Sequence, residues 1–216
     1  MTEKLLAAIS RAFPLREKDA GAYAGMKVNG MTFRIRCFEA EGLGWVSLMT
    51  ARGFFGLMKM DTLIVNPTAI DMPLLSWDRV NAMGNDTLIF ELYDTMISPG
   101  PLTATAEAKE EGRHLPDHDL GCHWYDSIKL PQSLSKKGKK VHTVAFDVLT
   151  ETYMQAFLAD CRSAAPCEAE AKREKASVYV EGLLTHGGPS TDVFKKAIGD
   201  EKTAHLFRHI LFGTKV

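Results

Sequence analysis

Asp78 is the residue whose type and position most clearly suggest chemistry. It follows Trp77 in the middle of Leu74 to Val80, a run with the character of a central β-strand. A carboxylate in such a strand is costly to bury unless it has a partner or a task. Asp78 is therefore the first candidate for the acid–base chemistry that carboxyl groups perform.

Histidine pairs offer a second kind of chemistry, metal binding, with less support. His205 and His209 stand four residues apart, a spacing that could hold a metal on one helix face, but no third ligand follows nearby. His114 and His118 flank Pro116, so they do not share a helix face. The sequence therefore predicts no metal site.

The segment from Cys122 to Asp126, which reads CHWYD, is rich in reactive and aromatic side chains. A cysteine–histidine nucleophile is conceivable there, but neighbours in sequence rarely provide one. We interpret His123 and Trp124 instead as parts of an aromatic loop over a ligand pocket.

The strand that would position Asp78 is one of several joined by short turns. Leu63 to Val65 precedes it and Leu88 to Leu92 follows it, and the break Gly84-Asn85-Asp86 is a hairpin signal. Earlier runs with strand character are Thr32 to Glu39, Trp45 to Thr50 and Phe55 to Val65. Successive strands with short connections form a meander, which predicts a mainly antiparallel sheet.

Helical spacing of apolar residues precedes and follows the strands. Residues 3–13 form one predicted helix, and others are expected from Phe146 onward, over about 167–184, over 191–198 and over 200–212. Residues 96–140, including the polar tract Ser133 to Lys140, predict an irregular excursion with one short helix. We therefore expect an α+β fold, a three-layer α/β/α sandwich in a single domain spanning 1–216. A ligand cleft is expected between the sheet and one helical layer.

The composition is that of an ordinary globular protein. The chain has 216 residues, of which 45% are hydrophobic and 25% charged. A net charge of -1 gives no reason to expect nucleic acid or a membrane surface as partner. No run reaches transmembrane length and no signal peptide is visible. The four cysteines lack zinc-ligand spacing, which favours free thiols in a reducing cytoplasm.

Two passages resemble the ferredoxin-dependent bilin reductases, the family of phycocyanobilin:ferredoxin oxidoreductase and red chlorophyll catabolite reductase. The stretch from Asp71 to Asp78 reads DMPLLSWD and is similar to the family pattern D-L-P-h-h-G-h-D, where h is apolar. Gly84 and then Leu92 to Asp94 follow it, as in the family's hairpin with an acidic turn. The stretch from Tyr179 to Phe212 is similar to the family's closing pattern: a helix, an N-D-P-A turn, a short helix and a final helix ending L-F. The family's α/β/α sandwich agrees with the fold expected above.

The resemblance implies reduction of a linear tetrapyrrole, biliverdin or a related bilin. Reduced ferredoxin would supply electrons singly to the substrate, with no cofactor bound by the protein, and acidic side chains would supply protons. Each added electron makes the conjugated pigment more basic, so a nearby acid must deliver a proton. A carboxylic acid does so at neutral pH only if burial raises its pKa. The family also implies a monomer.

The resemblance assigns roles to individual residues. Asp78 falls on the family's strand aspartate, which sits against the bilin and donates a proton. Asp61 falls where the family carries a polar residue facing the same pocket, although a solvent-facing residue is an equal alternative. Arg34, Arg36 and Arg52 are candidates for binding the bilin propionates, with a solvated surface as the default explanation.

The match fails at the closing turn, where Gly188 stands in place of a second proton-donating aspartate. His186 could serve instead, although an interaction with the helix-end carbonyls is at least as good an explanation. This loss keeps open an alternative function, a tetrapyrrole-binding protein without turnover. The lysines between 136 and 140 form a cluster of a kind that usually lies in a solvated loop. The same cluster would be complementary to an acidic ferredoxin docked on this protein.

Overall fold

Residues 1–188 and 190–215 are described by the computed structural model, and within them the strands form one eight-stranded sheet. The strand order is β1-β3-β4-β5-β6-β7-β8, with β2 also paired to β3, and every pairing is antiparallel. The strands are β1 (Leu15–Lys18), β2 (Gly25–Val28), β3 (Met31–Ala40), β4 (Gly44–Gly53), β5 (Met58–Pro67), β6 (Leu74–Ala82), β7 (Asn85–Tyr93) and β8 (Leu134–Lys139).

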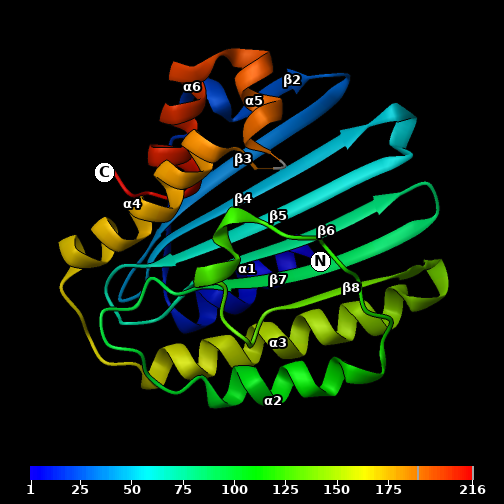
Figure 1. Cartoon of the computed structure of the whole chain (residues 1–216). Helices are drawn as coiled ribbons and strands as arrows, with labels where there is room; N and C mark the ends of the chain where they lie inside the picture. Colours follow the sequence, from blue (N-terminus) through cyan, green and yellow to red (C-terminus); the bar gives the residue numbers. More distant parts are fainter. Residues whose placement is uncertain (189, 216) are drawn as a thin grey trace.

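Helices cover both faces of this sheet (Figure 1). The helices are α1 (Thr2–Ala12), α2 (Thr103–Glu111), α3 (Thr143–Ser163), α4 (Ala169–His186), α5 (Thr191–Ile198) and α6 (Asp200–His205), which continues into a π-helical turn, η6 (Leu206–Leu211). α1 and α3 lie on one face, with α2 packed outside α3, and α4, α5, α6 and η6 lie on the other. The predicted three-layer α/β/α sandwich with an antiparallel sheet is confirmed.

Three strands fall where the sequence predicted loops. β1 and β2 lie in the glycine-rich segment after Pro14, and β8 occupies the polar tract after Ser133. Among the strands β8 pairs with β7, and residues 116–118 cover its other side, where the His118 amide donates to the Ser135 carbonyl at 3.0 Å and the Lys137 amide to the Pro116 carbonyl at 3.1 Å. A loop over a sheet edge protects it from pairing with other chains. Lys136 is not solvated as expected, because its buried Nζ donates to Asp117 at 2.6 Å.

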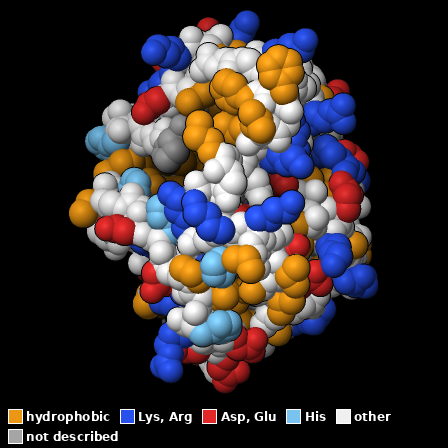
Figure 2. Space-filling view, turned by 90° about the vertical axis from the view of Figure 1, so that its right-hand side faces the viewer, with side chains coloured by type: hydrophobic (Ala, Val, Ile, Leu, Met, Phe, Trp, Pro, Cys, Tyr) orange, Lys and Arg blue, Asp and Glu red, His pale blue; other side chains and the backbone are white. Residues whose placement is uncertain are grey.

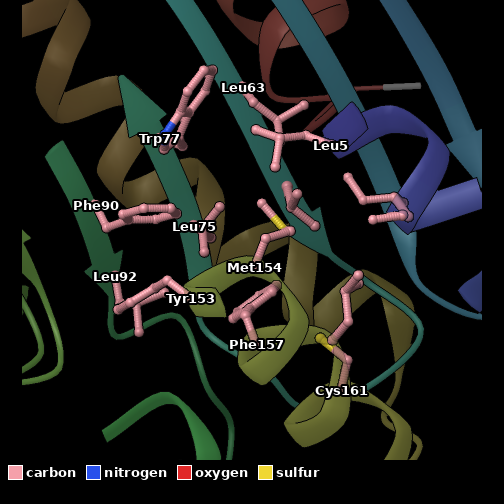
Figure 3. Packing of buried hydrophobic residues seen from close by; sticks show 14 of the residues in the cluster. Leu5, Leu63, Leu75, Trp77, Phe90, Leu92, Tyr153, Met154, Phe157 and Cys161 are labelled. Atoms are coloured by element: carbon pink, nitrogen blue, oxygen red, sulfur yellow. The ribbon is translucent and has the colours of Figure 1, made fainter. Parts of the chain in front are cut away.

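The α1–α3 face is filled by a continuous apolar core (Figure 3). Trp77 of β6 and Phe90 of β7 are fully buried there, and the Phe90 ring stacks on Tyr153 of α3 with 4.1 Å between centroids. Burial of each such side chain stabilises the fold by about 2–3 kcal/mol. Because side chains alternate along a strand, the side chain of Asp78 lies on the face opposite that of Trp77.

A buried ion pair strengthens this orientation of β6. Arg79 of β6 contacts Asp86 of β7 through two hydrogen bonds, at 2.5 and 2.6 Å, and Thr143 at the start of α3 donates to the same carboxylate at 2.7 Å. Removing one partner of a buried pair costs about 3–5 kcal/mol. A one-residue slip of β6 would break the pair and bury Asp78 in the apolar core.

The opposite helical layer is held to the sheet by Lys172 of α4, whose side chain is fully buried. Its Nζ donates to the carbonyls of Met72 at 2.6 Å and Thr95 at 2.8 Å. Burial lowers the pKa of Lys172 to about 8, and the nearby carboxylate of Asp71 opposes the shift. None of the helices described is both long and apolar enough to cross a bilayer.

Candidate functional site

A cavity of about 210 Å³ lies between the sheet and the layer formed by α4, α5 and η6, where the sequence predicted a cleft. The strands line it with alternate side chains, which are Met49, Met60, Thr62, Ile64, Ser76, Asp78, Val80, Ile89, Glu91 and Tyr93. A larger hollow of about 710 Å³ beside Pro14 and Gly42 is an open groove whose acidic residues are exposed. The cavity between the sheet and this layer is the one that contains Asp78, the candidate acid.

Asp78 is the central polar group of the cavity. Thr62, directly opposite on β5, donates its hydroxyl to Oδ1 at 2.5 Å, and Ser76 donates to Oδ2 at 3.2 Å. Burial raises the pKa of Asp78 to about 6, against the two hydroxyl bonds and with help from the negative charge of Glu91. Asp78 thus exchanges its proton close to neutral pH, as a general acid requires.

Glu91 is a second buried acid in the cavity, which the sequence reasoning missed. It lies directly opposite Ser76 on β7, and its Oε2 accepts the Tyr93 hydroxyl at 2.6 Å. Its Oε1 is buried without a hydrogen-bond partner among the described residues, with Lys129 Nζ at 3.7 Å. The argument that singled out Asp78, an acid inside an apolar strand run, applies equally to Glu91.

Aromatic rings from the sheet and from the opposite wall meet at one side of the cavity. Tyr93 of β7 stacks on Tyr179 of α4 with 4.1 Å between centroids, and Tyr125 meets both rings edge-on. His123 stacks on Tyr125 at 4.9 Å and also lines the cavity. Burial raises the pKa of all three tyrosines, which therefore keep their protons. Flat aromatic surfaces of this kind suit a planar conjugated ligand.

The loop that carries His123 is anchored to α4 by Trp124. The indole nitrogen donates to the carbonyl of Gly187 at 3.0 Å, and the ring lies so close to Gly182 that a Cβ there would come within 2.1 Å of it. The predicted aromatic loop therefore exists, and His123 lines the cavity. Trp124 does not line it, and Tyr125 does so instead.

The expectation that Asp61 faces the same pocket is wrong. Thr62 lines the cavity, so its neighbour Asp61 projects from the other face of β5, where it pairs with Arg52 at 2.5 Å. A resemblance read one residue out of register moves a side chain to the opposite face of a sheet.

Because side chains alternate between the two faces of a sheet, the arginines predicted to bind the propionates lie on the face opposite the cavity. Arg34, Arg36 and Arg52 have the strand parity of the α1–α3 face. Arg36 bonds Glu17 at 2.7 and 2.9 Å, and Arg34 is exposed. Their positions fit the alternative of a solvated strand face.

The closing turn reaches the cavity through Gly188 and not through His186. Gly188 lines the cavity, beside Leu183 and Thr191. His186 is exposed at the end of α4, with its ring 5.4 Å from Trp124, and does not line the cavity. Pro189, part of the motif of this turn, lies outside the described residues.

The histidines considered for metal binding do not assemble a ligand set. The rings of His205 and His209 stack 4.5 Å apart. Within the described parts of the chain, no group of three His, Cys, Asp or Glu side chains is placed to hold a metal ion.

Comparison with solved structures identifies the fold. The chain superposes on the crystal structure of phytochromobilin synthase from tomato in complex with biliverdin with a TM-score of 0.77, over 99% of this chain and 82% of that one. The two proteins share this fold. Sequence identity is 13%, and neither the protein-family models nor the curated proteins yield a match to the chain. The resemblance carried by Asp71 to Asp78 and by Tyr179 to Phe212 is thus confirmed at the level of the fold.

The cavity has a distinctive charge pattern. Its ionisable lining residues within the described chain are Asp78, Glu91, His123 and the three tyrosines, and no lysine or arginine is among them. Such a site can hold an apolar, planar ligand and exchange protons with it. It does not neutralise negative groups of a ligand deep inside, so these would have to point toward the mouth.

Proposed function

We propose that this protein reduces a linear tetrapyrrole, biliverdin or a related bilin, using electrons delivered one at a time by reduced ferredoxin. The observation that carries the proposal is Asp78, a half-buried acid in the cavity beside the sheet, whose pKa is raised to about 6 by desolvation. Biliverdin is the ligand of the tomato enzyme that has the same fold. A monomer as the working unit is part of this proposal and rests on the resemblance alone.

The chemistry follows from the surroundings of Asp78. One electron added to the pigment raises the basicity of its conjugated atoms, and the neutral Asp78 carboxyl gives up its proton to them. The resulting carboxylate is stabilised by the hydroxyls of Thr62 and Ser76, which already point at its two oxygens. These hydrogen bonds favour the product of the proton transfer.

Binding a bilin requires the cavity to widen. Its volume of about 210 Å³ is below the ~300–1,000 Å³ typical of small-molecule sites. The loop with His123 and the turn at Gly188 form the wall opposite the strands and would move outward. The pigment would then stack on the tyrosines with its propionates directed to the mouth.

The electron donor would dock at the end of the sheet where the β4–β5, β6–β7 and β8–α3 turns meet. Phe55, Met83 and Val141 are exposed there, beside Lys137 and Lys140. Figure 2 looks onto this end and shows lysine and arginine side chains between and around hydrophobic ones. A surface on which apolar side chains lie among lysines and arginines is complementary to a protein with an acidic binding surface. Lys136 belongs to the basic patch predicted from the sequence, but it is buried and therefore does not contribute to this docking surface.

A second function, tetrapyrrole binding without turnover, is favoured by one observation. Gly188 lies on the cavity wall where the family's motif places a second acid. If turnover needs an acid on that wall, the protein would only carry or sequester the pigment.

One assay separates these functions. The protein is mixed with biliverdin, and then with ferredoxin, its reductase and NADPH without oxygen, while the absorbance is recorded. Turnover replaces the bilin bands by those of a shorter conjugated system, whereas binding alone only shifts them. No shift at all would refute both functions.

The variant Asp78→Asn tests the proposed acid in this assay. We expect it to bind biliverdin and to lose turnover by roughly 10²–10⁴-fold. Asp61→Asn is the matched control, because it makes the same change on the neighbouring strand but outside the cavity. Unimpaired turnover in Asp78→Asn would remove this residue from the mechanism.

A further inference from the structure

Glu91 is a buried acid that the mechanism above leaves without a task. Reduction of one double bond consumes two electrons and two protons, whereas the Asp78 carboxyl holds one proton at a time. Once Asp78 has given its proton to the pigment, it needs another before it can act again. A proton must therefore reach Asp78 again between the two electron transfers, while the pigment occupies the cavity.

Ser76 lies between Glu91 and Asp78, and among the described residues its side chain is hydrogen-bonded to Asp78 only. Ser76 lies directly opposite Glu91 in the β6–β7 ladder, and its hydroxyl donates to Asp78 Oδ2 at 3.2 Å. A hydroxyl both donates and accepts, so Ser76 can pass a proton from one carboxyl group to the other.

Glu91 is also connected to the protein surface. Lys129 Nζ stands 3.7 Å from Glu91 Oε1 and 2.8 Å from Asp126 Oδ1. The side chains of Lys129 and Asp126 are 25% and 36% exposed. Ionisable groups therefore run from solvent to the cavity.

The free oxygen of Glu91 supports such a task. Tyr93 holds Oε2, while Oε1 is buried with no hydrogen bond from the described residues. A buried carboxylate oxygen without a partner is destabilising and calls for an explanation. An oxygen that must accept a proton from one side and release it to the other provides one.

We propose that Glu91 is a proton relay that reloads Asp78 between the two electron transfers, an inference that rests on the proposed function. In the first step the pigment takes one electron from the donor and the proton of Asp78, which becomes a carboxylate. A proton then passes from the Lys129 ammonium to Glu91 and through Ser76 to Asp78, and Lys129 takes another from solvent. The second electron and this proton complete the reduction.

Other ionisable groups lie beside this path and could in principle also carry the proton. Tyr93, Tyr125 and Tyr179 keep their protons because burial raises their pKa values. His123 also lines the cavity, with Nδ1 4.0 Å from Asp126 Oδ1, and is the competing entry point. Glu91 differs from His123 in lying opposite the serine that bonds Asp78.

The variant Glu91→Gln tests the relay, because it preserves shape but cannot carry a proton. With electrons supplied singly, without oxygen and at a pH well below the pKa of Asp78, where its carboxyl is protonated in both proteins, we expect the first reduction at the wild-type rate. The neutral pigment radical should then accumulate, visible by absorbance and electron paramagnetic resonance, and the second reduction should slow roughly 10²-fold. Loss of the Glu91 charge should also move the pH dependence of the first step to lower pH, a change that a purely structural role would not produce.

Two further variants keep the result decisive. Lys129→Met interrupts the path one step outward and should accumulate the same radical, including in the case that Glu91→Gln does not fold. Glu174→Gln, on the exposed side of α4, should leave both steps unchanged. Wild-type rates for both reductions in Glu91→Gln or Lys129→Met, or radical accumulation in His123→Gln alone, would overturn the relay. A wild-type protein that never reduces the pigment would refute the proposed function itself.

Discussion

Asp78 and Asp61 lie on neighbouring strands and yet differ completely in their surroundings. Asp78 faces a cavity and receives two hydroxyl bonds, whereas Asp61 pairs with Arg52 on the opposite face of the sheet. The difference follows from the two-residue alternation of a strand. At the scale of single residues, the face of the sheet decides which carboxyl group can act as an acid.

The raised pKa of Asp78 predicts a pH dependence of stability. Its usual value of 3.8 applies to the unfolded chain, and burial raises it to about 6 in the folded protein. Between these values the folded state binds more protons, so ionisation of Asp78 lowers the stability as the pH rises, by at most about 3 kcal/mol above pH 6. In Asp78→Asn this loss should be absent, which urea unfolding at pH 4.5 and 7.5 can measure. The same loss in both proteins would mean that Asp78 is not shielded from water.

How far single residues could be predicted depends on their register. The location of Asp78 in a cavity followed from its strand run, and Glu91 could have been found by the same argument. Asp61 was misplaced because a short motif does not determine which face of a strand a residue takes, whereas the default interpretation of Arg34, a solvated strand face, fits its position. Pairing partners, such as Thr62 opposite Asp78, are long-range contacts that a single sequence does not contain.

At the scale of elements, strands with a long run or a regular alternation of apolar residues could be predicted from the sequence. Strands without such a pattern could not. The five strands β3 to β7 have long apolar runs and all were found. β1 and β8 are short and largely polar, because each lies toward an edge of the sheet and has little apolar surface to bury, and β2 has four residues, too few to show a period. Composition alone does not separate such strands from loops.

The contact between α4 and the His123 loop predicts an unusual effect of alanine in a helix. Gly182→Ala in a helix interior should stabilise by about 0.5–1 kcal/mol. Here the new Cβ would come within 2.1 Å of Trp124, so the indole must leave its site and the loop must loosen. We expect red-shifted tryptophan fluorescence and biliverdin binding weakened on the order of tenfold, or 1.4 kcal/mol.

Val178→Ala is the control for this experiment, since Val178 is exposed on the same helix. It should change neither the fluorescence nor the affinity. Tighter pigment binding in Gly182→Ala would show that the anchored loop closes the cavity against the ligand and does not help to hold it.

At the scale of the whole molecule, the two faces of the sheet divide the work. The α1–α3 face is packed with side chains such as Trp77 and Phe90 and supplies stability. The α4–η6 face leaves a cavity, and Met60 and Val80 extend its lining toward the turns shown in Figure 2. An electron donor docked at those turns would therefore stand close to the pigment without entering the cavity.

This arrangement predicts that donor binding and pigment binding can be separated. Lys137 and Lys140 are exposed at the turn end, where their charges would attract an acidic donor. The double variant Lys137→Glu/Lys140→Glu should slow reduction by ferredoxin about tenfold at low ionic strength, with the difference shrinking as salt screens the charges. Biliverdin affinity should be unchanged, because neither residue lines the cavity. Arg11→Glu/Lys215→Glu makes the same change in charge near the other end of the sheet and should leave the rate intact. Equal slowing in both double variants would show that net charge, and not this surface, governs the encounter.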